Sequence, residues 1–419
     1  MEHLNTKGFQ ELTRINDALR IFFDAIGEVR VKVETVGIHE AVGRILARNL
    51  VADRYLPSAD LSTLDGYAVR WADVQNASQN TPVVLHIVGE SRLGESSGLK
   101  VRSGQAVLVA TGSTLPAGAD SVAVVERTRR KQGNMVEVQA SVAAGHGVSK
   151  KGDDIAPGRL VLSEGRRIRP EDIGMFRALS LSEVRVAERL RVGILSTGNE
   201  LVNFPRKSDR TKIVDVNRPI LSAMIRKFGA HPVDLGIARD EERAIAHALR
   251  KGMRSADVIL VTAGSSVGRK DLVPKCINSL GKPGMVVHGV AMRPAMPTGL
   301  AVVNGKPVVS LPGFPVSALI AFRVFVIPLL AKLVGLPKPV EPTIRAVLTE
   351  KVMGVPQYRT FVRVSVQRGK AAFLAQPLKV QRSSLLTNIV ESNGVVTVPE
   401  DVVSIDAGQE VEVLLTGDV

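Results

Sequence analysis

Three strand-like runs of the chain each end in a loop that is rich in hydroxyl, glycine, proline and acidic residues. The loop residues are Ser196, Thr197, Gly198 and Glu200, then Gly264, Ser265, Ser266, Gly268 and Asp271, and finally Pro312, Gly313, Pro315 and Ser317. Hydroxyls and flexible backbone N–H groups in such loops can bind phosphates or oxyanions, and carboxylates can hold a divalent cation. The same residue types are also ordinary turn formers and helix caps, and Asp271 stands just where a helix should begin.

The runs that carry these loops have the pattern of strands buried in a parallel sheet. Residues 258–261 are four consecutive apolar residues, mostly β-branched, and residues 190–195 and 306–311 are also strand-like. If the three strands are parallel neighbours, their loops meet along the carboxyl edge of the sheet, where ligands bind in open α/β folds. We therefore expect the chemistry of this protein at that edge.

Helices and strands alternate through residues 188–336, which predicts an α/β domain. The predicted helices cover 217–228, 241–252, 272–280 and 315 to about 334, and further strands cover 232–236, 286–290 and 307–311. Cys276 falls on the third helix and is expected in the core. Residues 314–336 are the most apolar window, but Arg323, Pro328 and Lys332 interrupt it, which favours a buried helix over a membrane span.

The rest of the chain predicts smaller units around this domain. Asn16 can cap a helix over 17–26, and a strand at 29–34 and a helix at 39–48 follow. Short apolar runs separated by turn residues predict a small all-β module, and the alternating tail predicts a small barrel or sandwich. The expected fold class is thus multidomain α/β plus β: a discontinuous α+β domain (1–51 and 150–187), an inserted β module (52–149), a central α/β domain with a mostly parallel sheet (188–336) and a C-terminal β-barrel-like domain (337–419).

Composition narrows the classes of function. The 419 residues carry a formal net charge of +14, one Cys and seven scattered His, so neither a disulfide nor a His/Cys metal cluster is expected. The first residues contain no apolar export segment, and we expect a cytoplasmic protein without membrane contact. The charge attracts anions. Because the basic runs at 127–131 and 166–169 are short and lack aromatics, small anionic substrates are favoured over nucleic acid, which remains an alternative on charge alone.

Seven short motifs follow one another along the chain. They are DGYAV at 65–69, ATG at 110–112, GDDI at 152–155, LSTGNEL at 195–201, DVNR at 215–218, GSSVG at 264–268 with Asp271, and LPGFPVS at 311–317. Each motif alone is weakly specific. Together, in this order and over nearly the whole chain, they resemble the MoeA family, the molybdopterin molybdenumtransferases that also include the E domain of gephyrin.

The resemblance implies a reaction and an assembly. Molybdate, or tungstate, is inserted into the dithiolene of adenylylated molybdopterin, and AMP is released. The central domain is expected to be MoaB/Mog-like, with a MoaB/Mog-type adenylyltransferase as a candidate partner. The protein is expected to be a homodimer in which the inserted β module of one subunit faces the α/β cleft of the other.

The resemblance also assigns roles to individual residues. The expected catalytic acids are Asp65, Asp154, Glu200, Asp240 and Asp271, the first two arriving from the other subunit and Asp240 and Asp271 holding Mg²⁺. The expected substrate-binding residues are Thr111, Ser196, Thr197, Gly198, Asn217, Gly264, Ser265, Ser266, Gly268, Arg293, Pro312, Gly313, Pro315, Ser317, Arg363 and Ser383. An Arg on an alternating strand, such as Arg363, is more often only a solvated surface residue.

One motif departs from the family. Where the family usually reads KPGKP, this chain reads Arg293-Pro294-Ala295-Met296-Pro297. Arg keeps the first charge and can hold an oxyanion in a forked fashion, whereas Met296 has neither charge nor strong donors. Ala295 replaces a Gly, which restricts the backbone if φ is positive there. The departure keeps two alternatives open: a weakly catalytic or non-catalytic paralogue that binds molybdopterin or partner proteins, and a molybdopterin adenylyltransferase, although adenylylating proteins lack the extra β domains.

Overall fold

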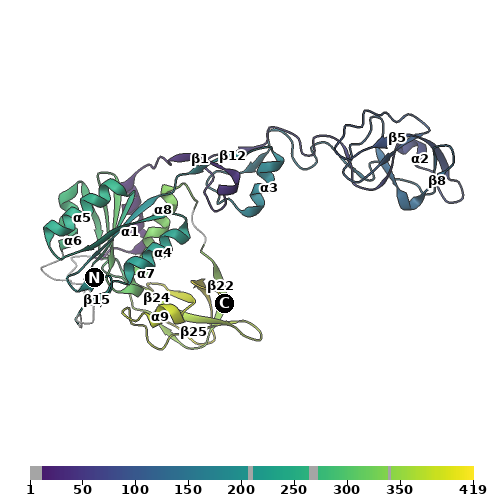
Figure 1. Cartoon of the computed structure of the whole chain (residues 1–419). Coiled ribbons are helices and arrows are strands. Elements are labelled where there is room, and N and C mark those ends of the chain that lie inside the picture. The colour runs from purple at the N-terminus through teal and green to yellow at the C-terminus, as the bar shows by residue number, and fades with distance from the viewer. Residues whose placement is uncertain (1–11, 206–210, 264–271, 338–340) are drawn as a thin grey trace.

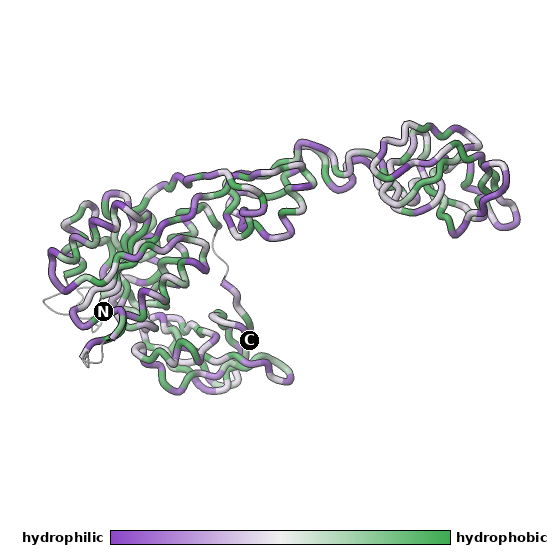
Figure 2. The backbone as a smooth tube through the Cα atoms, viewed as in Figure 1, coloured by the Kyte–Doolittle hydropathy of each residue, from purple (hydrophilic) through white to green (hydrophobic). Residues whose placement is uncertain are grey.

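The computed structural model describes residues 12–205, 211–263, 272–337 and 341–419. The molecule is elongated: an α/β domain and a β-barrel lie side by side at one end, and a narrow arm carries a β module to the other end (Figure 1). Apolar segments run through each of these parts (Figure 2), and each part has its own cluster of buried side chains.

The α/β domain is built on a sheet with the strand order β16-β13-β17-β21-β20-β18. Neighbours among β16, β13, β17 and β21 are parallel, and β20 is antiparallel to both of its neighbours. The strands are β13 (Arg191–Thr197), β16 (His231–Ala238), β17 (Val258–Ala263), β18 (Pro283–His288), β20 (Gly299–Val303) and β21 (Lys306–Pro312). The expectation that the three loop-bearing strands are parallel neighbours is therefore confirmed. The chain reverses its direction of winding between β13 and β17, the kind of switch point where such sheets bind ligands.

Helices cover both faces of this sheet. Ile194 and Leu260 point into one core and Leu195 and Ile259 into the other, because alternate residues of a strand face opposite sides. The first face carries α1 (Ile15–Ile26), α4 (Asn217–Phe228) and the continuous helix α7 (Pro315–Ala321), η3 (Phe322–Val326) and α8 (Ile327–Leu333). The second face carries α5 (Glu242–Ser255) and α6 (Leu272–Leu280), with Cys276 buried as expected.

The helix from Pro315 to Leu333 is long and apolar enough to cross a membrane by length and composition alone. In this fold 61% of its most apolar window is buried, and Phe322, Phe325 and Leu329 pack in the core of the α/β domain. Its middle turn, η3, is a π-helix. The structure thus uses this apolar segment as a core helix.

The arm joins the α/β domain through an antiparallel pair, β1 (Val33–Gly37) and β12 (Glu183–Ala187). Further along lie η1 (Ile38–Glu40), β2 (Leu50–Val51), β11 (Leu160–Leu162) and α3 (Pro170–Ala178), then β3 (Leu61–Ser62) paired with β10 (Val148–Ser149). The inserted module follows, with sheet order β7-β4-β6-β5-β9-β8. Its elements are β4 (Gly66–Val69), α2 (Trp71–Val74), β5 (Val83–Ser91), β6 (Gln105–Val109), β7 (Ser121–Val124), η2 (Val125–Arg127), β8 (Thr128–Lys131) and β9 (Met135–Val138).

Three expectations for the N-terminal region were wrong in detail. α1 begins at Ile15, with Arg14 rather than Asn16 at the N-cap, and it packs on the α/β sheet although it precedes the arm in sequence. The first strand lies at 33–37 rather than 29–34. The helix predicted at 39–48 is absent from this described segment, because Gly43 has a φ of +78° and Ile45 and Leu46 form bridges with the returning chain.

The C-terminal domain is a closed barrel in the order β24-β25-β22-β28-β26, where β26 pairs back onto β24. Its strands are β22 (Thr343–Leu348), β24 (Arg359–Arg368), β25 (Phe373–Pro377), β26 (Gly394–Val398) and β28 (Glu410–Leu415), and short elements are β23 (Val352–Met353), α9 (Thr387–Glu391) and β27 (Ser404–Ile405). Val364, Val396 and Val413 form its core. A short strand of the α/β domain, β19 (Met292–Arg293), runs parallel to β24 and continues this sheet.

Candidate functional site

Hydroxyl groups at the end of β13 tie the central strands together. Thr262 Oγ1 donates to Ser196 Oγ at 3.1 Å, and Thr197 Oγ1 donates to the carbonyl oxygen of Thr262 at 3.3 Å. Both Ser196 and Thr197 are buried. Both of these predicted anion-binding residues therefore engage their hydroxyl oxygens within the sheet: Thr197 donates its hydroxyl proton there, whereas Ser196 only accepts.

The loop after β13 gathers two of the predicted acids. Asn199 N donates to Asp240 Oδ2 at 3.2 Å, and Asp240 N donates to Asn199 Oδ1 at the same distance, so the loops after β13 and β16 are clasped together. The Glu200 carboxylate lies against Gly198, where an added Cβ would come within 2.7 Å of Oε1. Lys212 Nζ donates to the carbonyl oxygen of Asn199 at 2.7 Å. Lys212 is a cation at this edge that no sequence motif indicates. It directly precedes β15 (Ile213–Val214), which pairs with β14 (Leu201–Val202).

The DVNR motif acts as a scaffold for the third loop. Asn217 Nδ2, at the start of α4, donates to the carbonyl oxygen of Gly313 at 2.7 Å. Buried Asp215 and Arg218 form an ion pair of 3.2 Å, and Arg218 also contacts Asp234 at 2.9 Å. The predicted binding residue Asn217 thus holds the loop that contains Pro312, Gly313 and Pro315 against the start of α4.

A cavity of about 350 Å³ lies between this sheet edge and the barrel. Its lining includes three predicted site residues from distant parts of the chain, Arg293, Ser317 and Ser383. Two contacts join the walls: Val316 N donates to the carbonyl oxygen of Ser383 at 3.2 Å, and the Arg293 guanidinium lies 5.0 Å from the centroid of the Tyr358 ring. A cation over an aromatic face at this distance is attracted by the ring. Tyr358 has no motif signal, since only the β19–β24 pairing brings it here.

The divergent turn lines the same cavity. Ala295 is buried and has a φ of +85°, so this chain places a side chain in the left-handed region that favours the glycine of the family pattern. Met296 lines the cavity and packs partly against Leu12, Ala291 and Tyr358. The cavity therefore has a forked cation from Arg293 and an apolar thioether in place of a second ammonium group.

Arg363 lies in a separate, larger cavity. It is 3% exposed, and its Nε and Nη2 atoms have no hydrogen-bond partner among the described residues. Burial lowers the pKa of its guanidinium. This cavity, of about 980 Å³, lies between the arm root, α4, α7 and the barrel, and Val316 in its wall directly precedes Ser317 of the smaller cavity. The bland expectation of a solvated Arg363 is wrong, since the residue is 3% exposed and lines this cavity.

The two acids of the arm lie away from the sheet edge. Asp65 accepts hydrogen bonds from Thr111 N at 2.7 Å and Thr111 Oγ1 at 3.0 Å, which lower the pKa of its carboxyl. Asp154 lies on the returning chain after β10, where its backbone N donates a hydrogen bond to the carbonyl oxygen of Leu56. Within one chain the inserted module sits at the opposite end of the molecule from the α/β sheet (Figure 1). Asp65 and Thr111 therefore cannot serve the sheet edge of their own chain in this arrangement.

The predicted site also includes the loop after β17 and a metal site. Gly264, Ser265, Ser266, Gly268 and Asp271 lie outside the described residues, so the positions predicted for them stay predictions. Asp240 is the one predicted Mg²⁺ ligand that is described. Within the described ranges, no group of three or more His, Cys, Asp or Glu could hold a metal ion.

Comparison with known proteins covers the whole architecture. Three family models match in order: "MoeA N-terminal region (domain I and II)" over residues 13–180, "Probable molybdopterin binding domain" over 193–332 and "MoeA C-terminal region (domain IV)" over 345–416. Molybdopterin molybdenumtransferase 2 of Mycobacterium tuberculosis is 34% identical over 385 residues, which cover 90% of this chain and 94% of the relative. Molybdopterin molybdenumtransferase of Bacillus subtilis is 30% identical over 387 residues, covering 92% and 90%.

A solved structure agrees with these relatives. The molybdopterin biosynthesis MoeA protein of Pyrococcus horikoshii superposes with a TM-score of 0.85 at 30% identity and covers 97% of this chain and 100% of its own. The relatives, the three family models and the elongated four-part architecture all agree with the order of the seven sequence motifs. The chain therefore belongs to the MoeA family.

Proposed function

We propose that this protein is a molybdopterin molybdenumtransferase, which inserts molybdate or tungstate into the dithiolene of adenylylated molybdopterin and releases AMP. The observation that carries the proposal is the cavity shared by the sheet edge and the barrel, which is lined by Arg293, Ser317 and Ser383. A tetrahedral dianion needs charge-assisted donors from several sides, and a guanidinium fork with hydroxyls supplies them. The family membership and the printed names of the relatives support the same reaction.

Different residues of the site bind different parts of the substrates. Arg293 holds the oxyanion, with its guanidinium kept in place by Tyr358, and the hydroxyls of Ser317 and Ser383 donate to oxyanion oxygens. The backbone N–H groups of the loops at the sheet edge bind the phosphates of the adenylylated pterin. Water or a molybdate oxygen attacks the phosphoanhydride, so that the bond between the pterin phosphate and AMP breaks, and the two dithiolene thiols displace oxygen from molybdate as water. Both ends of the substrate must therefore be held at once.

The direct test is incubation with adenylylated molybdopterin and molybdate while AMP release is measured. Arg293→Ala should lower kcat/KM for molybdate about tenfold or more, because a charge-assisted contact is lost. Arg345→Ala is the matched control, since its side chain is 81% exposed and paired only with Glu410. Pterin binding without AMP release would favour the alternative of a binding paralogue, which the presence of Met296 also favours. Adenylylation of molybdopterin by ATP would identify the protein as the adenylyltransferase.

We also propose that the site is shared between two copies of the chain. The support is the position of Asp65, which is held by Thr111 yet lies at the far end of the arm from its own sheet. Mixing inactive Asp65→Ala with inactive Asp271→Ala subunits should restore part of the activity, because one site of each mixed dimer keeps both acids. An absence of recovery after verified subunit exchange contradicts a shared site.

Mg²⁺ is proposed as the cofactor, held by Asp240 and Asp271. Removal of divalent cations should stop AMP release, and added Mg²⁺ should restore it. Asp240→Asn should raise the Mg²⁺ concentration needed for half-maximal activity, since an amide is a poorer ligand than a carboxylate for this cation. Full activity of the wild-type protein after chelation contradicts this assignment.

We propose that the net charge of +14 serves to attract small anionic substrates rather than nucleic acid. Turnover at low substrate concentration should fall as ionic strength rises, while duplex DNA binds only weakly at physiological salt. Tight, sequence-selective DNA binding under those conditions contradicts it. We propose a cytoplasmic location and delivery of the adenylylated substrate by a MoaB/Mog-type adenylyltransferase, which co-purification from the native organism tests.

A further inference from the structure

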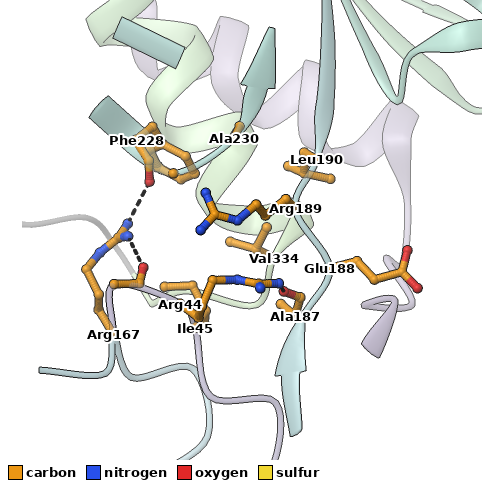
Figure 3. A pocket seen from close by; sticks show the side chains of 12 residues that line it. Arg44, Ile45, Arg167, Ala187, Glu188, Arg189, Leu190, Phe228, Ala230 and Val334 are labelled. Carbon is orange, nitrogen blue, oxygen red and sulfur yellow. Dashed lines mark hydrogen bonds between the residues drawn. The ribbon is translucent and has the colours of Figure 1, made fainter. Parts of the chain in front are cut away.

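The Arg167 side chain links the root of the arm to the α/β domain (Figure 3). Arg167, from the loop between β11 and α3, donates from Nη1 to the carbonyl oxygen of Gly43 at 2.7 Å and from Nη2 to the carbonyl oxygen of Phe228 at 3.1 Å. Its guanidinium also lies 5.6 Å from the centroid of the Phe228 ring. Gly43 belongs to the arm and Phe228 ends α4, so Arg167 joins the two parts.

These contacts are strong for physical reasons. The last carbonyl groups of α4 carry the negative end of the helix dipole and lack partners within the helix, so a cation there is favourable. The planar fork of Arg reaches two carbonyl groups at once, which an ammonium on a flexible stem does not do in the same geometry. Arg167 is half-buried at this junction, and this burial lowers the pKa of its guanidinium.

The rest of the junction supplies a pivot. Ile45, Ala187 and Val334 form a small apolar cluster where the arm meets the α/β domain, and such contacts resist separation more than rotation. The adjoining cavity, lined also by Arg44 and Arg189, is only about 20 Å³, which is room for about one water molecule. It is too small for a substrate. Arg167 also lines the larger cavity that contains Arg363, but its Nη1 and Nη2 atoms both donate to backbone carbonyl groups, so these contacts are structural.

Because the arm is long, a small change in its angle at the root produces a large displacement of the module at its tip. The inserted module with Asp65 lies at the far end (Figure 1), so rotation about the pivot displaces Asp65 much more than Arg167. We propose that Arg167 is a positioning residue that fixes the angle of the arm, and thereby places the module of one subunit at the sheet edge of the other. This inference rests on the shared site proposed above.

The angle can be measured without any substrate. Spin labels on Arg130→Cys in the module and Lys251→Cys in α5 report the distance between the arm and the α/β domain; Cys276 is buried and stays unlabelled. Arg167→Ala should broaden the distance distribution, and Arg167→Lys should broaden it less. Arg169→Ala is the matched control, since Arg169 pairs with Asp172 inside the arm. An unchanged distribution in Arg167→Ala overturns the proposal, and if that variant does not fold, Arg167→Lys decides in the same way.

A mixed dimer separates positioning from general damage. The productive site in the pair of Asp65→Ala and Asp271→Ala chains uses the arm of the Asp271→Ala chain. Adding Arg167→Ala to that chain should lower AMP release about tenfold or more, with molybdate dependence unchanged, because misplacement of a catalytic group is costly. The same change in the Asp65→Ala chain, whose arm is idle, should have little effect.

Equal losses from both placements mean that Arg167 acts on the α/β domain, and they overturn the positioning role. If the parent mixed dimer is itself inactive, the shared site fails, whereas the spin-label distances still decide whether Arg167 fixes the arm.

Discussion

The barrel and the inserted module are both peripheral to the α/β domain, but they are attached in different ways. The barrel is joined by backbone pairing: β19 of the α/β domain runs beside β24, with Met292 opposite Arg359 and Arg293 opposite Thr360. The module is carried on an arm whose root has one side-chain fork and a small apolar pivot. Backbone pairing fixes the distance and the register between the barrel and the α/β domain, whereas the two hydrogen bonds of Arg167 fix only the angle of the arm.

The difference matches what each part contributes to the site. Ser383 lines the cavity that contains Arg293, and the Tyr358 ring contacts the Arg293 guanidinium, so the distances of both residues from Arg293 must be constant. Asp65 of the module has to approach a different chain, which requires correct direction rather than a fixed internal distance. Apart from the loss of a catalytic acid, the largest effects on activity should therefore come from the barrel seam, and smaller ones from changes within the cavity.

The largest effect is expected for Arg359→Pro. Arg359 N donates to the carbonyl oxygen of Ala291 at 3.1 Å, and proline removes this donor, which leaves the acceptor unpaired at a cost of about 1–3 kcal/mol. The seam should open, kcat/KM for AMP release should fall about a hundredfold, and amide exchange in β19 should accelerate. Arg359→Ala keeps the N–H and loses only the ion pair with Glu400, so it should retain most activity. A folded proline variant with normal activity shows that the seam is dispensable.

An intermediate effect is expected for Met296→Lys. An ammonium added to the cavity restores a charge-assisted contact with the oxyanion, worth roughly 1.5–3 kcal/mol, so the molybdate concentration for half-maximal AMP release should fall about ten- to a hundredfold. Partial packing of Met296 against Tyr358 still lets a Lys stem lie there with its charge toward the cavity. Pterin affinity should not change. Met253→Lys adds the same charge on α5 and controls for the general field; an equal response there refutes a local contact.

The smallest effect is expected for Ala295→Gly. Glycine relieves the strain of the left-handed backbone in the folded state, but it also increases the conformational entropy of the unfolded chain. The first effect should exceed the second by about 0.5–1 kcal/mol, which raises Tm by about 2 °C. Ala301→Gly, in a buried strand, should instead lower Tm. A lower Tm for Ala295→Gly means that its methyl group contributes more packing energy than the turn costs.

Local signals in the sequence predict the strongest elements well. The bounds of α4 and α6 agree with the sequence pattern, and Gly229 ends α4 with a φ of +104°. The strand β20 was missed, although Asn304 and Gly305, both with positive φ, form the hairpin signal between it and β21. The helix expected at 39–48 failed because pairing with the returning chain, which is not a local property, overrides helix propensity there.

For the site, motifs predict the loops but not the use of each side chain. Ser196 and Asn217 were expected to bind substrate, and the structure engages their side chains within the protein. Tyr358 and Lys212 reach the site only through tertiary pairing, so neither carries a motif. The positive φ of Ala295 could be anticipated, because a Gly in a family pattern often marks such a position.

The pairing of β1 with β12 has a consequence for the construction of the chain. Gly37 lies opposite Glu183, so residues 38–182, with the whole β module, are topologically one hairpin loop. The entropy of closing a loop rises only slowly with its length, so a module of this size can be carried at little cost to the pair that holds it. The two ends of the excursion are already neighbours, and a short turn between Gly37 and Glu183 would leave the α/β domain and barrel as one continuous, shorter chain.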